Sequence, residues 1–251
     1  MVRMIMHGCN GRMGQMITGI VDRDDEIRIV AGVDINDKQL NDYPVFKSIN
    51  DVNVDADVVV DFGATAAIDN LLSWCKNTKT PCVVCTTGLS EEQIANVSKT
   101  AESVAMLRSA NMSLGINTLI KLLKEAANVF APAGFDVEVV EKHHKMKLDA
   151  PSGTAIALAD AVNEARNNEY TYVYDRSGRR QVRDEKEIGI SAVRGGTIVG
   201  EHDVIFAGED EVITFSHTAY SRAVFAKGAI QAAKFLYNKE PGLYTMADVV
   251  K

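Results

Sequence analysis

The stretch MIMHGCNGRMG, residues 4–14, decides how the first half of this chain folds. A short apolar run precedes glycines at positions 8, 11 and 14, and a helix-period segment then continues to about residue 21. Small residues between a strand and a helix let the backbone approach a pyrophosphate, because the free N–H groups and the dipole of the helix start favour negative charge. The spacing is GxxGxxG rather than GxGxxG, and Asn10, which tolerates a left-handed backbone, replaces the second glycine of the motif. The stretch predicts a dinucleotide-binding turn, with a tight turn that binds nothing as the alternative.

A carboxylate further along the chain strengthens the first interpretation. Asp34 follows Gly14 by about 20 residues and ends a predicted strand at 28–33, where an acid accepts hydrogen bonds from an adenosine ribose. The alternative is a solvated aspartate in a turn. A carboxylate repels a 2′-phosphate, and Ile35 rather than an arginine follows it, although Arg12 and Lys38 could still reach a phosphate. We therefore expect NADH as the favoured cofactor, with NADPH tolerated.

Strands and helices alternate through the first 110 residues. Nearly continuous apolar runs predict strands at 57–62, 81–85 and 104–108. Helices are predicted at 66–76 and from Ser90, a plausible N-cap with Gln93 in the capping-box position. This alternation predicts an α/β protein with a Rossmann-like, doubly wound parallel sheet covered on both faces.

The pattern changes after about residue 113. A long helix is predicted at 113–130, a strand at 135–140 and a helix at 153–165, followed by a polar loop or insertion at 166–186. Strands with glycine turns fill 187–217, and we expect them to be antiparallel because their connections are too short for crossovers. A helix at 221–237 should return to the first domain. We predict a dinucleotide-binding domain of residues 1–112 and 219–251, and a substrate-binding and oligomerisation domain of residues 113–218, an α+β unit with an open mixed or antiparallel sheet.

The composition indicates a globular cytoplasmic protein. Of its 251 residues 46% are hydrophobic, and its net charge of −7 disfavours general binding to nucleic acid or to an anionic membrane. No apolar run has the length of a membrane span, and the start of the chain becomes glycine-rich too early for a signal peptide. The four cysteines fit a reducing compartment. A redox or zinc role for Cys82-x-x-Cys85 is disfavoured, because residues three apart on a strand face opposite ways and no second CxxC follows, so no metal is expected.

A basic cluster precedes the predicted helix at 153–165. The stretch EKHHKMKLDAPSGTA, residues 141–155, holds two adjacent histidines and three lysines ahead of a Pro-Ser-Gly-Thr turn. N–H groups at Gly153 and Thr154 would suit a carboxylate, with His144 and Lys147 adding charge. Adjacent side chains diverge in an extended segment, so His143 should have a different role from His144. The alternative is a solvated basic loop with an ordinary helix cap.

The pattern Glu141-x-His143-His144-x-x-Lys147-x-Asp149-x-Pro151-Ser152-Gly153-Thr154 resembles the signature of the 4-hydroxy-tetrahydrodipicolinate reductase (dihydrodipicolinate reductase) family, which acts in the diaminopimelate route to lysine. The resemblance extends over nearly the whole chain. It includes the turn at 8–14, the loop Thr86-Thr87-Gly88, SANMSLG at 109–115, VRGGTIVGEH at 193–202 and SHTAYSR at 216–222.

The resemblance implies a reaction and a set of residues. Hydride passes from a nicotinamide to C4 of a cyclic dicarboxylate imine, the 4-hydroxyl leaves as water, and the neighbouring carbon is protonated. His143 matches the proton donor and Lys147 the assisting lysine, while His144, Gly153 and Thr154 match contacts to the substrate carboxylate. The positions that match cofactor contacts are Gly8, Cys9, Asn10, Gly11, Arg12, Met13, Asp34, Cys85, Thr86, Thr87, Ser109, Ala110, Asn111 and Met112. A homotetramer formed through the C-terminal sheets is implied as well.

Three positions depart from the family pattern. Cys85 stands where many members carry glycine, Met112 replaces a common aromatic residue, and Gly63 replaces a usual threonine or serine. Each affects the expected affinity or preference for the cofactor, and none touches the proposed acid–base residues.

Further polar residues are predicted to be structural. His7, His202 and His217 are interpreted as satisfied structural histidines, while Glu141 and Asp149 should orient the basic loop. Arg194 could face the substrate or pair with a nearby acid.

Two alternative functions remain. Another two-domain dehydrogenase, acting on an amino acid or a sugar, explains the glycine turn but not the basic motif. A non-catalytic NAD(H) sensor would need a partner or DNA surface, and the sequence shows neither a helix-turn-helix nor a basic face.

Overall fold

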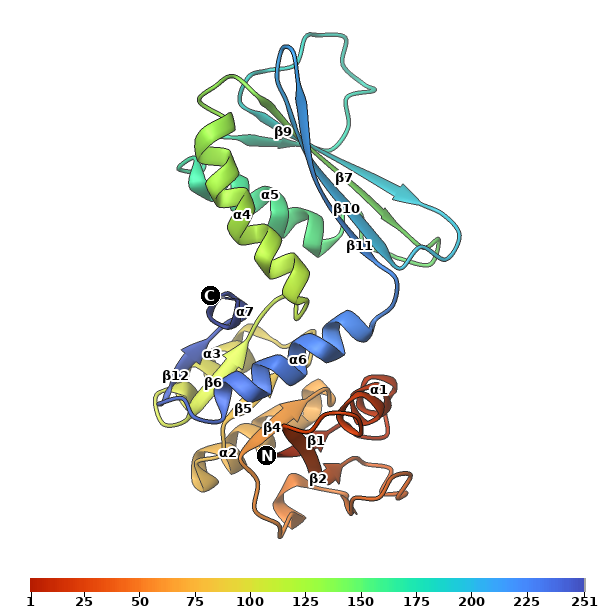
Figure 1. Ribbon diagram of the computed structural model, residues 1–251, viewed down its shortest axis with the longest axis vertical. Helices are drawn as coiled ribbons and strands as arrows, with labels where there is room; N and C mark the ends of the chain where they lie inside the picture. Colours follow the sequence, from red (N-terminus) through yellow and green to blue (C-terminus); the bar gives the residue numbers. More distant parts are fainter. Residues whose placement is uncertain (251) are drawn as a thin grey trace. The chain divides into compact units, whose positions relative to one another are not determined.

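The computed structural model describes residues 1–250, which form two compact units (Figure 1). Unit 1 contains Met1–Leu114 and the segment from Ala223 onward, and unit 2 contains Gly115–Arg222. Among the helices of residues 1–250, none combines the length and the apolar character that crossing a bilayer requires.

Unit 1 is built on a seven-stranded sheet with the order β12-β6-β5-β4-β1-β2-β3, in which all pairs are parallel. Its elements are β1 (Val2–His7), α1 (Arg12–Val21), β2 (Ile27–Val33), β3 (Val45–Phe46), β4 (Val58–Asp61), α2 (Ile68–Thr78), β5 (Cys82–Val84), α3 (Glu91–Ala101), β6 (Ala105–Arg108), α6 (Ala223–Leu236), β12 (Gly242–Tyr244) and α7 (Met246–Val249). The predicted parallel sheet is confirmed. Because β1 lies between β2 and β4, the strand order reverses there, and such a switch point is where doubly wound sheets bind ligands.

Both faces of this sheet are covered, which is why its strands are apolar at successive positions. Met4 and Met6 belong to the core on the side of α1 and α6, whereas Ile5 between them belongs to the core on the side of α2 and α3. All three side chains are fully buried. The predicted capping box is present, since Ser90 Oγ accepts a hydrogen bond from the N–H of Gln93 and the Gln93 side chain accepts one from the N–H of Ser90.

Unit 2 is a five-stranded mixed sheet with the order β11-β10-β7-β9-β8. Its elements are α4 (Leu114–Phe130), β7 (Asp136–His143), α5 (Gly153–Ala165), β8 (Thr171–Val173), β9 (Glu187–Arg194), β10 (Gly200–Ala207) and β11 (Val212–Ala219). Side chains of α4 and α5 pack with those of β7, β9 and β10 in one core, on one face of the sheet.

The expectation that residues 187–217 are wholly antiparallel is wrong. β10 is antiparallel to β7 and β11, but β9 is parallel to both β7 and β8. The reason is that β7 lies between β9 and β10, so these consecutive strands do not pair with each other. The chain reaches β9 from β7 by way of α5, a connection long enough for parallel pairing.

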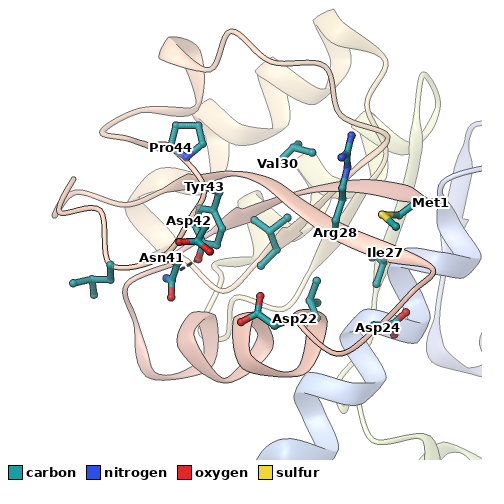
Figure 2. A pocket seen from close by; sticks show the side chains of 13 residues that line it. Met1, Asp22, Asp24, Ile27, Arg28, Val30, Asn41, Asp42, Tyr43 and Pro44 are labelled. Atoms are coloured by element: carbon teal, nitrogen blue, oxygen red, sulfur yellow. Dashed lines mark hydrogen bonds between the residues drawn. The ribbon is translucent and has the colours of Figure 1, made fainter.

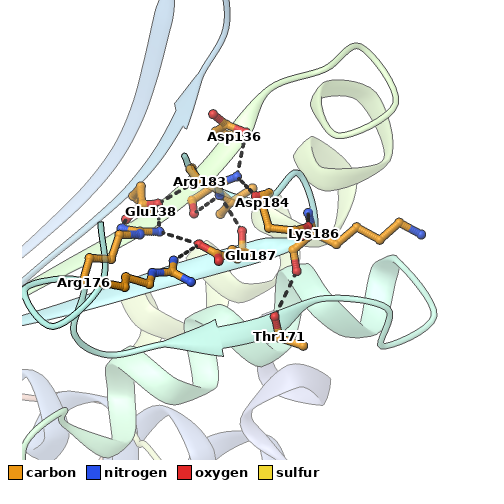
Figure 3. Close-up of polar contacts among 10 residues, drawn as sticks. Asp136, Glu138, Thr171, Arg176, Arg183, Asp184, Lys186 and Glu187 are labelled. Atoms are coloured by element: carbon orange, nitrogen blue, oxygen red, sulfur yellow. Dashed lines mark hydrogen bonds and ion pairs between the residues drawn. The ribbon is translucent and has the colours of Figure 1, made fainter. Parts of the chain in front are cut away.

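The polar segment 166–186 is tied to the sheet by arginines (Figure 3). Arg176 Nη2 lies 2.7 Å from Glu138 Oε1, and Arg183 Nη1 lies 2.7 Å from Asp136 Oδ1. Burial alone would raise the pKa of Glu138, but Arg176 and Arg183 together hold it below its usual value. The segment predicted as a loop or insertion therefore contains one short strand, β8, and ion pairs that fix it to β7.

Candidate active site

The C-terminal half of β7 carries polar side chains into the core face of unit 2. Side chains alternate along a strand, so Glu141 and His143 continue the row of Val137 and Val139 toward the side covered by α4 and α5. Glu141 is fully buried and His143 is 8% exposed. The period of the strand thus places a carboxylate and an imidazole side by side.

Glu141 is the centre of the unit 2 site. Arg194, at the end of β9, binds it in a bidentate manner, with Nη1 2.7 Å from Oε2 and Nη2 2.6 Å from Oε1. The backbone N–H of Ser152 donates to Oε1 at 2.9 Å. Burial would raise the pKa of Glu141, but the hydrogen bonds from Arg194, His143 and Ser152 outweigh it and lower the pKa. Glu141 is therefore an ionised anchor rather than a proton donor.

His143 is held at one nitrogen and leaves the other for chemistry. Its Nδ1 lies 2.6 Å from Glu141 Oε2, which places the shared proton on Nδ1 because Glu141 is ionised. Its Nε2 makes no hydrogen bond within residues 1–250 and lies next to Gly200, where an added Cβ would be 3.1 Å away. The His202 ring packs edge-on against it, with 5.1 Å between ring centroids. Nε2 is thus the ring nitrogen without a hydrogen-bond partner in residues 1–250.

His202 is buried and neutral, and it supports the start of α5. Its Nε2 lies 3.0 Å from Ser152 Oγ, which accepts the N–H of Ala155 at 3.1 Å and so caps the helix. Burial, with a smaller contribution from nearby His143, lowers the pKa of His202 to about 4. Its Nδ1 is buried and has no partner in the described residues, as is Nδ1 of His217. The prediction that these two histidines are fully satisfied is therefore wrong for one nitrogen of each.

The basic loop brings Lys147 to a carboxylate of its own segment. Lys147 Nζ lies 2.8 Å from Asp149 Oδ1, and this contact is the main reason that the pKa of Asp149 is lowered. The backbone N–H of Gly153 contributes a smaller lowering. Lys147 thus binds a carboxylate beside the start of α5. His144 and Thr154 are half-buried in this region.

In unit 1 the glycines at positions 8, 11 and 14 form a tight turn at the start of α1. Gly8 has a φ of +81°, and an added Cβ there would lie 2.6 Å from the carbonyl oxygen of Phe62. A Cβ at Gly14 would lie 2.3 Å from the carbonyl oxygen of Gly8, so α1 packs directly on the turn. No side chain caps α1 at Gly11. The turn and the helix start therefore leave backbone groups for an anionic group such as a pyrophosphate.

Asp34 is fastened to this turn. Its Oδ2 accepts the N–H of Asn10 at 3.0 Å, and its Oδ1 accepts the N–H of Asn36 at 3.0 Å. A cavity of about 300 Å³ runs from Gly8 and Gly11 past Asp34 and Ile35 to Phe62. Of the residues predicted from the sequence for phosphate and ribose, Gly8, Gly11 and Asp34 thus line one cavity.

A larger cavity of about 680 Å³ lies elsewhere in unit 1 (Figure 2). It is lined by residues around Asp22, Arg28 and Tyr43, and it contains none of the residues predicted for a site. We therefore place the candidate cofactor site in the smaller cavity.

Two predicted cofactor residues have side chains in the core. Cys9 is fully buried and Met112 is 5% exposed, and both belong to the core on the α1 side of the sheet. Burial, followed by the charge of Asp34, raises the pKa of the Cys9 thiol to about 11. The side chains of both residues thus face the core, and contacts with a cofactor would come from their backbones.

The remaining predicted cofactor residues lie on loops and helix starts. Gly11, Arg12, Thr87 and Ala110 are exposed, whereas Met13, Ser109 and Asn111 are half-buried. Burial raises the pKa of the half-buried Cys85 thiol well above its usual value. Thr86 Oγ1 donates to Asp61 Oδ2 at 2.8 Å, which ties the loop after β5 to the end of β4.

Two residues that were not predicted from the sequence as site residues, Arg194 and Asp61, contact the candidate sites of unit 2 and unit 1. Arg194, whose role was left open, pairs with Glu141, and Asp61 pairs with His7 Nδ1 at 2.7 Å. The departure at Gly63 has a steric cause, because an added Cβ there would lie 2.6 Å from His7 Nδ1. Strand periodicity would have put Glu141 beside His143, but no local pattern points to partners more than 50 residues away, such as Arg194 at a separation of 53.

Comparisons with known proteins point to the same family for both halves of the chain. A family model described as "Dihydrodipicolinate reductase, N-terminus" matches residues 2–112, and one described as "Dihydrodipicolinate reductase, C-terminus" matches residues 115–250. The chain is 54% identical over 251 residues to the 4-hydroxy-tetrahydrodipicolinate reductase of Caldanaerobacter subterraneus subsp. tengcongensis, covering 100% of this chain and 99% of that protein. It is 46% identical to the reductase of Clostridium botulinum, covering 100% and 98% of the two chains. A solved dipicolinate-bound dihydrodipicolinate reductase from Paenisporosarcina sp. TG-14 superposes with a TM-score of 0.81 at 26% identity, covering 98% of this chain and 97% of that one.

Proposed function

The chain belongs to the dihydrodipicolinate reductase family and catalyses the reduction of 4-hydroxy-tetrahydrodipicolinate in lysine biosynthesis with a nicotinamide cofactor, and we propose that His143 and Lys147 carry the acid–base part of this reaction. The observation that supports this assignment is the buried pair of His143 and Glu141, with Nδ1 fixed 2.6 Å from a carboxylate and Nε2 left without a partner in residues 1–250. Overall, the substrate accepts one hydride from the reduced cofactor and one proton. The products are tetrahydrodipicolinate, water and the oxidised cofactor.

The bound nicotinamide supplies the hydride that C4 of the substrate ring receives. The proton that completes the reduction must reach the neighbouring carbon, and we propose that Nε2 of a protonated His143 donates it. Glu141 holds the ring in one orientation and stabilises the imidazolium, as the carboxylate of a histidine–carboxylate pair does elsewhere. Arg194 keeps Glu141 ionised, so the proton given to the substrate comes from the imidazole and not from the carboxylate.

We propose that the substrate carboxylate replaces Asp149 at Lys147, beside the backbone N–H of Gly153. Lys147 already binds a carboxylate, that of Asp149, which is exposed enough to move away. His144 and the start of α5 at Thr154 would complete the contacts, with the helix N-terminus favouring the negative charge. Lys147 then neutralises the substrate anion while the ring is being protonated.

For the cofactor, we propose contacts from the turn at Gly8 to Met13, from Asp34, from the loop of Cys85, Thr86 and Thr87, and from Ser109 to Met112. Cys9 and Met112 would contribute backbone groups only. We further propose that NADH is favoured and NADPH tolerated, because the Asp34 carboxylate repels a 2′-phosphate. The cavity from Gly8 to Ile35 supports this arrangement.

We also propose a homotetramer formed through the five-stranded sheets. Val193 and Val212 lie on the sheet face opposite α4 and α5, where they are 46% and 62% exposed. A sheet face with exposed valines is stabilised by cover from another copy. Light scattering should give about four times the chain mass of 27.3 kDa, and a monomeric mass would contradict the proposal.

The free cysteines fit a cytoplasmic location.

A coupled assay tests the reaction and the preference together. A synthase supplies the substrate, and the loss of NADH or NADPH absorbance is followed. We expect oxidation of both cofactors with a higher kcat/KM for NADH, and Asp34→Asn should shift the ratio toward NADPH by roughly tenfold. An unchanged ratio in that variant would contradict the role of Asp34. The absence of oxidation with either cofactor, despite NADH binding, would instead favour a different dehydrogenase or a sensor.

A further inference from the structure

A buried polar pair closes the sheet of unit 1 at its switch point. His7 is the last residue of β1, Asp61 is the last residue of β4, and the two are opposite each other in the parallel pairing. His7 Nδ1 lies 2.7 Å from Asp61 Oδ1, and the residues are 6% and 1% exposed. Ligands of doubly wound sheets bind beyond the carboxyl ends of the strands at this point. The pair therefore lies at the place where a dinucleotide would cross the sheet.

Asp61 holds three donors at once. Besides His7, its Oδ1 accepts the N–H of Gly63 at 2.8 Å, and its Oδ2 accepts the hydroxyl of Thr86 at 2.8 Å. The Gly63 N–H and the Thr86 hydroxyl are both donors, so we assign the proton of the third contact to Nδ1 of His7, which then donates to Oδ1. Through Asp61, His7 is connected to the loop that follows β5.

The chain after β4 leaves room for the imidazole. A Cβ at Gly63 would lie 2.6 Å from Nδ1 and 2.7 Å from Cε1 of His7, closer than side-chain atoms approach. Glycine at position 63 is therefore a steric requirement of histidine at position 7. The hydroxyl that the family pattern places at 63 is absent, and an imidazole occupies its surroundings.

The second ring nitrogen is the one available to a ligand. Nε2 of His7 makes no hydrogen bond within residues 1–250, and His7 lines the cavity that also contains Gly8, Gly11 and Asp34. His7 contacts Asp61 on β4, and the cavity that it lines also contains Asp34 after β2 and Lys47 after β3. Asp34 accepts two backbone N–H groups and Lys47 lies 3.5 Å from Asp37, so both have partners of their own.

We propose that His7 binds the pyrophosphate of the nicotinamide dinucleotide through Nε2–H, and that it takes up a proton from solvent as the cofactor binds. The inference rests on the proposed cofactor turn at residues 8–13. The proton moves from water to Nε2, which gives an imidazolium between two anions, the Asp61 carboxylate and the pyrophosphate. Asp61 also accepts the hydroxyl of Thr86. Asp61 therefore positions the loop after β5 relative to the glycine turn that follows His7.

Calorimetry of NADH binding in buffers of different ionisation enthalpy measures the proton uptake directly. Near pH 7.5 the wild-type protein should take up a substantial fraction of a proton per NADH. His7→Asn fits the space and can still donate an N–H to Asp61, but it cannot be protonated. We expect it to lose the uptake and to bind NADH roughly ten- to hundredfold more weakly at pH 6, with the gap narrowing toward pH 9.

The matched control is His217→Asn on β11 of unit 2, which should leave NADH affinity and proton uptake unchanged. A His7→Asn protein with wild-type uptake and wild-type affinity would overturn the proposal. Weaker binding by the same factor at every pH, with uptake retained, would assign His7 a structural role only and would also overturn it.

A second measurement needs no variant. In protein labelled with ¹⁵N-histidine, both ring nitrogens of His7 should move to imidazolium values as NADH is added. A ring that stays neutral in the saturated complex contradicts the proposal even if the His7→Asn protein does not fold. Failure of the wild-type protein to bind either cofactor would overturn the cofactor turn together with this inference, whereas cofactor binding without turnover would bear only on the reaction.

Discussion

Each unit of the chain contains one buried histidine bonded to one carboxylate, and the two pairs differ in what else the carboxylate binds. In unit 2 Glu141 holds His143 and also forms a bidentate ion pair with Arg194. In unit 1 Asp61 holds His7, and its other hydrogen-bond donors, the N–H of Gly63 and the hydroxyl of Thr86, are neutral. Glu141 is thus balanced by a permanent cation, Arg194. Among the partners of Asp61, His7 alone can carry a positive charge.

The difference suggests two uses of the same motif. With Arg194 in place, Glu141 keeps its charge whichever form His143 takes, so the imidazole can give up a proton and recover it in each turnover. Without an arginine, the charge of Asp61 favours a protonated partner when a second anion arrives. We therefore expect His143 to change protonation during the reaction and His7 to change it on binding.

Replacement of the unit 2 histidine should have the largest effect. His143→Gln removes the proposed proton donor but leaves unit 1 untouched, so kcat should fall by roughly 10²–10⁴-fold with the Kd for NADH unchanged. Steady-state kinetics and calorimetry measure the two quantities. A near-normal kcat would refute the assignment, and a matching loss of NADH affinity would mean that the two pairs are not separate.

Removal of the cation that distinguishes the pairs should destabilise unit 2. Arg194→Met leaves the buried Glu141 without its bidentate partner, so the free energy of unfolding should fall by about 3–5 kcal/mol. Circular dichroism is the suitable probe, because the single tryptophan, Trp74, lies on α2 in unit 1. Arg194→Lys keeps the charge but not the fork geometry. Its free energy of unfolding should lie between those of the wild type and Arg194→Met. A loss below about 1 kcal/mol in the methionine variant would argue against Glu141 as an ionised anchor.

His202, which packs against the unit 2 pair, should make that unit sensitive to acid. Burial lowers the pKa of His202 from 6.5 to about 4, so between these values the unfolded chain binds a proton that the folded chain does not. Stability should therefore fall as the pH decreases from 6.5 to 4, by on the order of 3 kcal/mol from this group. Urea unfolding across this range should be compared with that of His202→Asn. Equal pH slopes for the two proteins would contradict the buried neutral histidine.

Crowding of the unit 1 histidine should have the smallest effect. Gly63→Ser places a Cβ 2.6 Å from His7 Nδ1 and should lower stability by about 1–3 kcal/mol, which His7→Ala should partly restore in the double variant. Gly200→Ala is the control in unit 2, where the Cβ would lie 3.1 Å from His143 Nε2 and needs only a small adjustment. Additive effects of Gly63→Ser and His7→Ala would show that the two positions are not coupled.

Sequence patterns predicted the elements and missed the long-range pairs. Continuous apolar runs, the glycine turn and the Ser90 cap are local signals, and each of them led to a strand, turn or helix that the structure contains. The parallel pairing of β9 with β7 could not be read locally, because it depends on which strand lies between β9 and β10. The short β12, with three residues, gave too weak a pattern to be predicted.

The same limit applies to the sites. The basic motif led to His143 and Lys147, whose placement follows from the periodicity of β7 and the start of α5. His7 was interpreted as a simple structural residue, because nothing near it in the sequence indicates Asp61, 54 residues away. Cys9 was expected at the cofactor because of its neighbours, and the packing of α1 on the sheet directs its side chain into the core instead. Which side of a turn a residue faces is decided by tertiary packing.

The ion pair between Asp149 and Lys147 bears on selectivity. On the proposed binding mode, an incoming ligand does not fill a vacant site but competes with a tethered carboxylate at high local concentration. A monocarboxylate would exchange one such contact for an equivalent one and gain little. A dicarboxylate displaces the tether with one group and keeps a second for further contacts, so the internal competitor acts as a filter that only a doubly charged ligand passes.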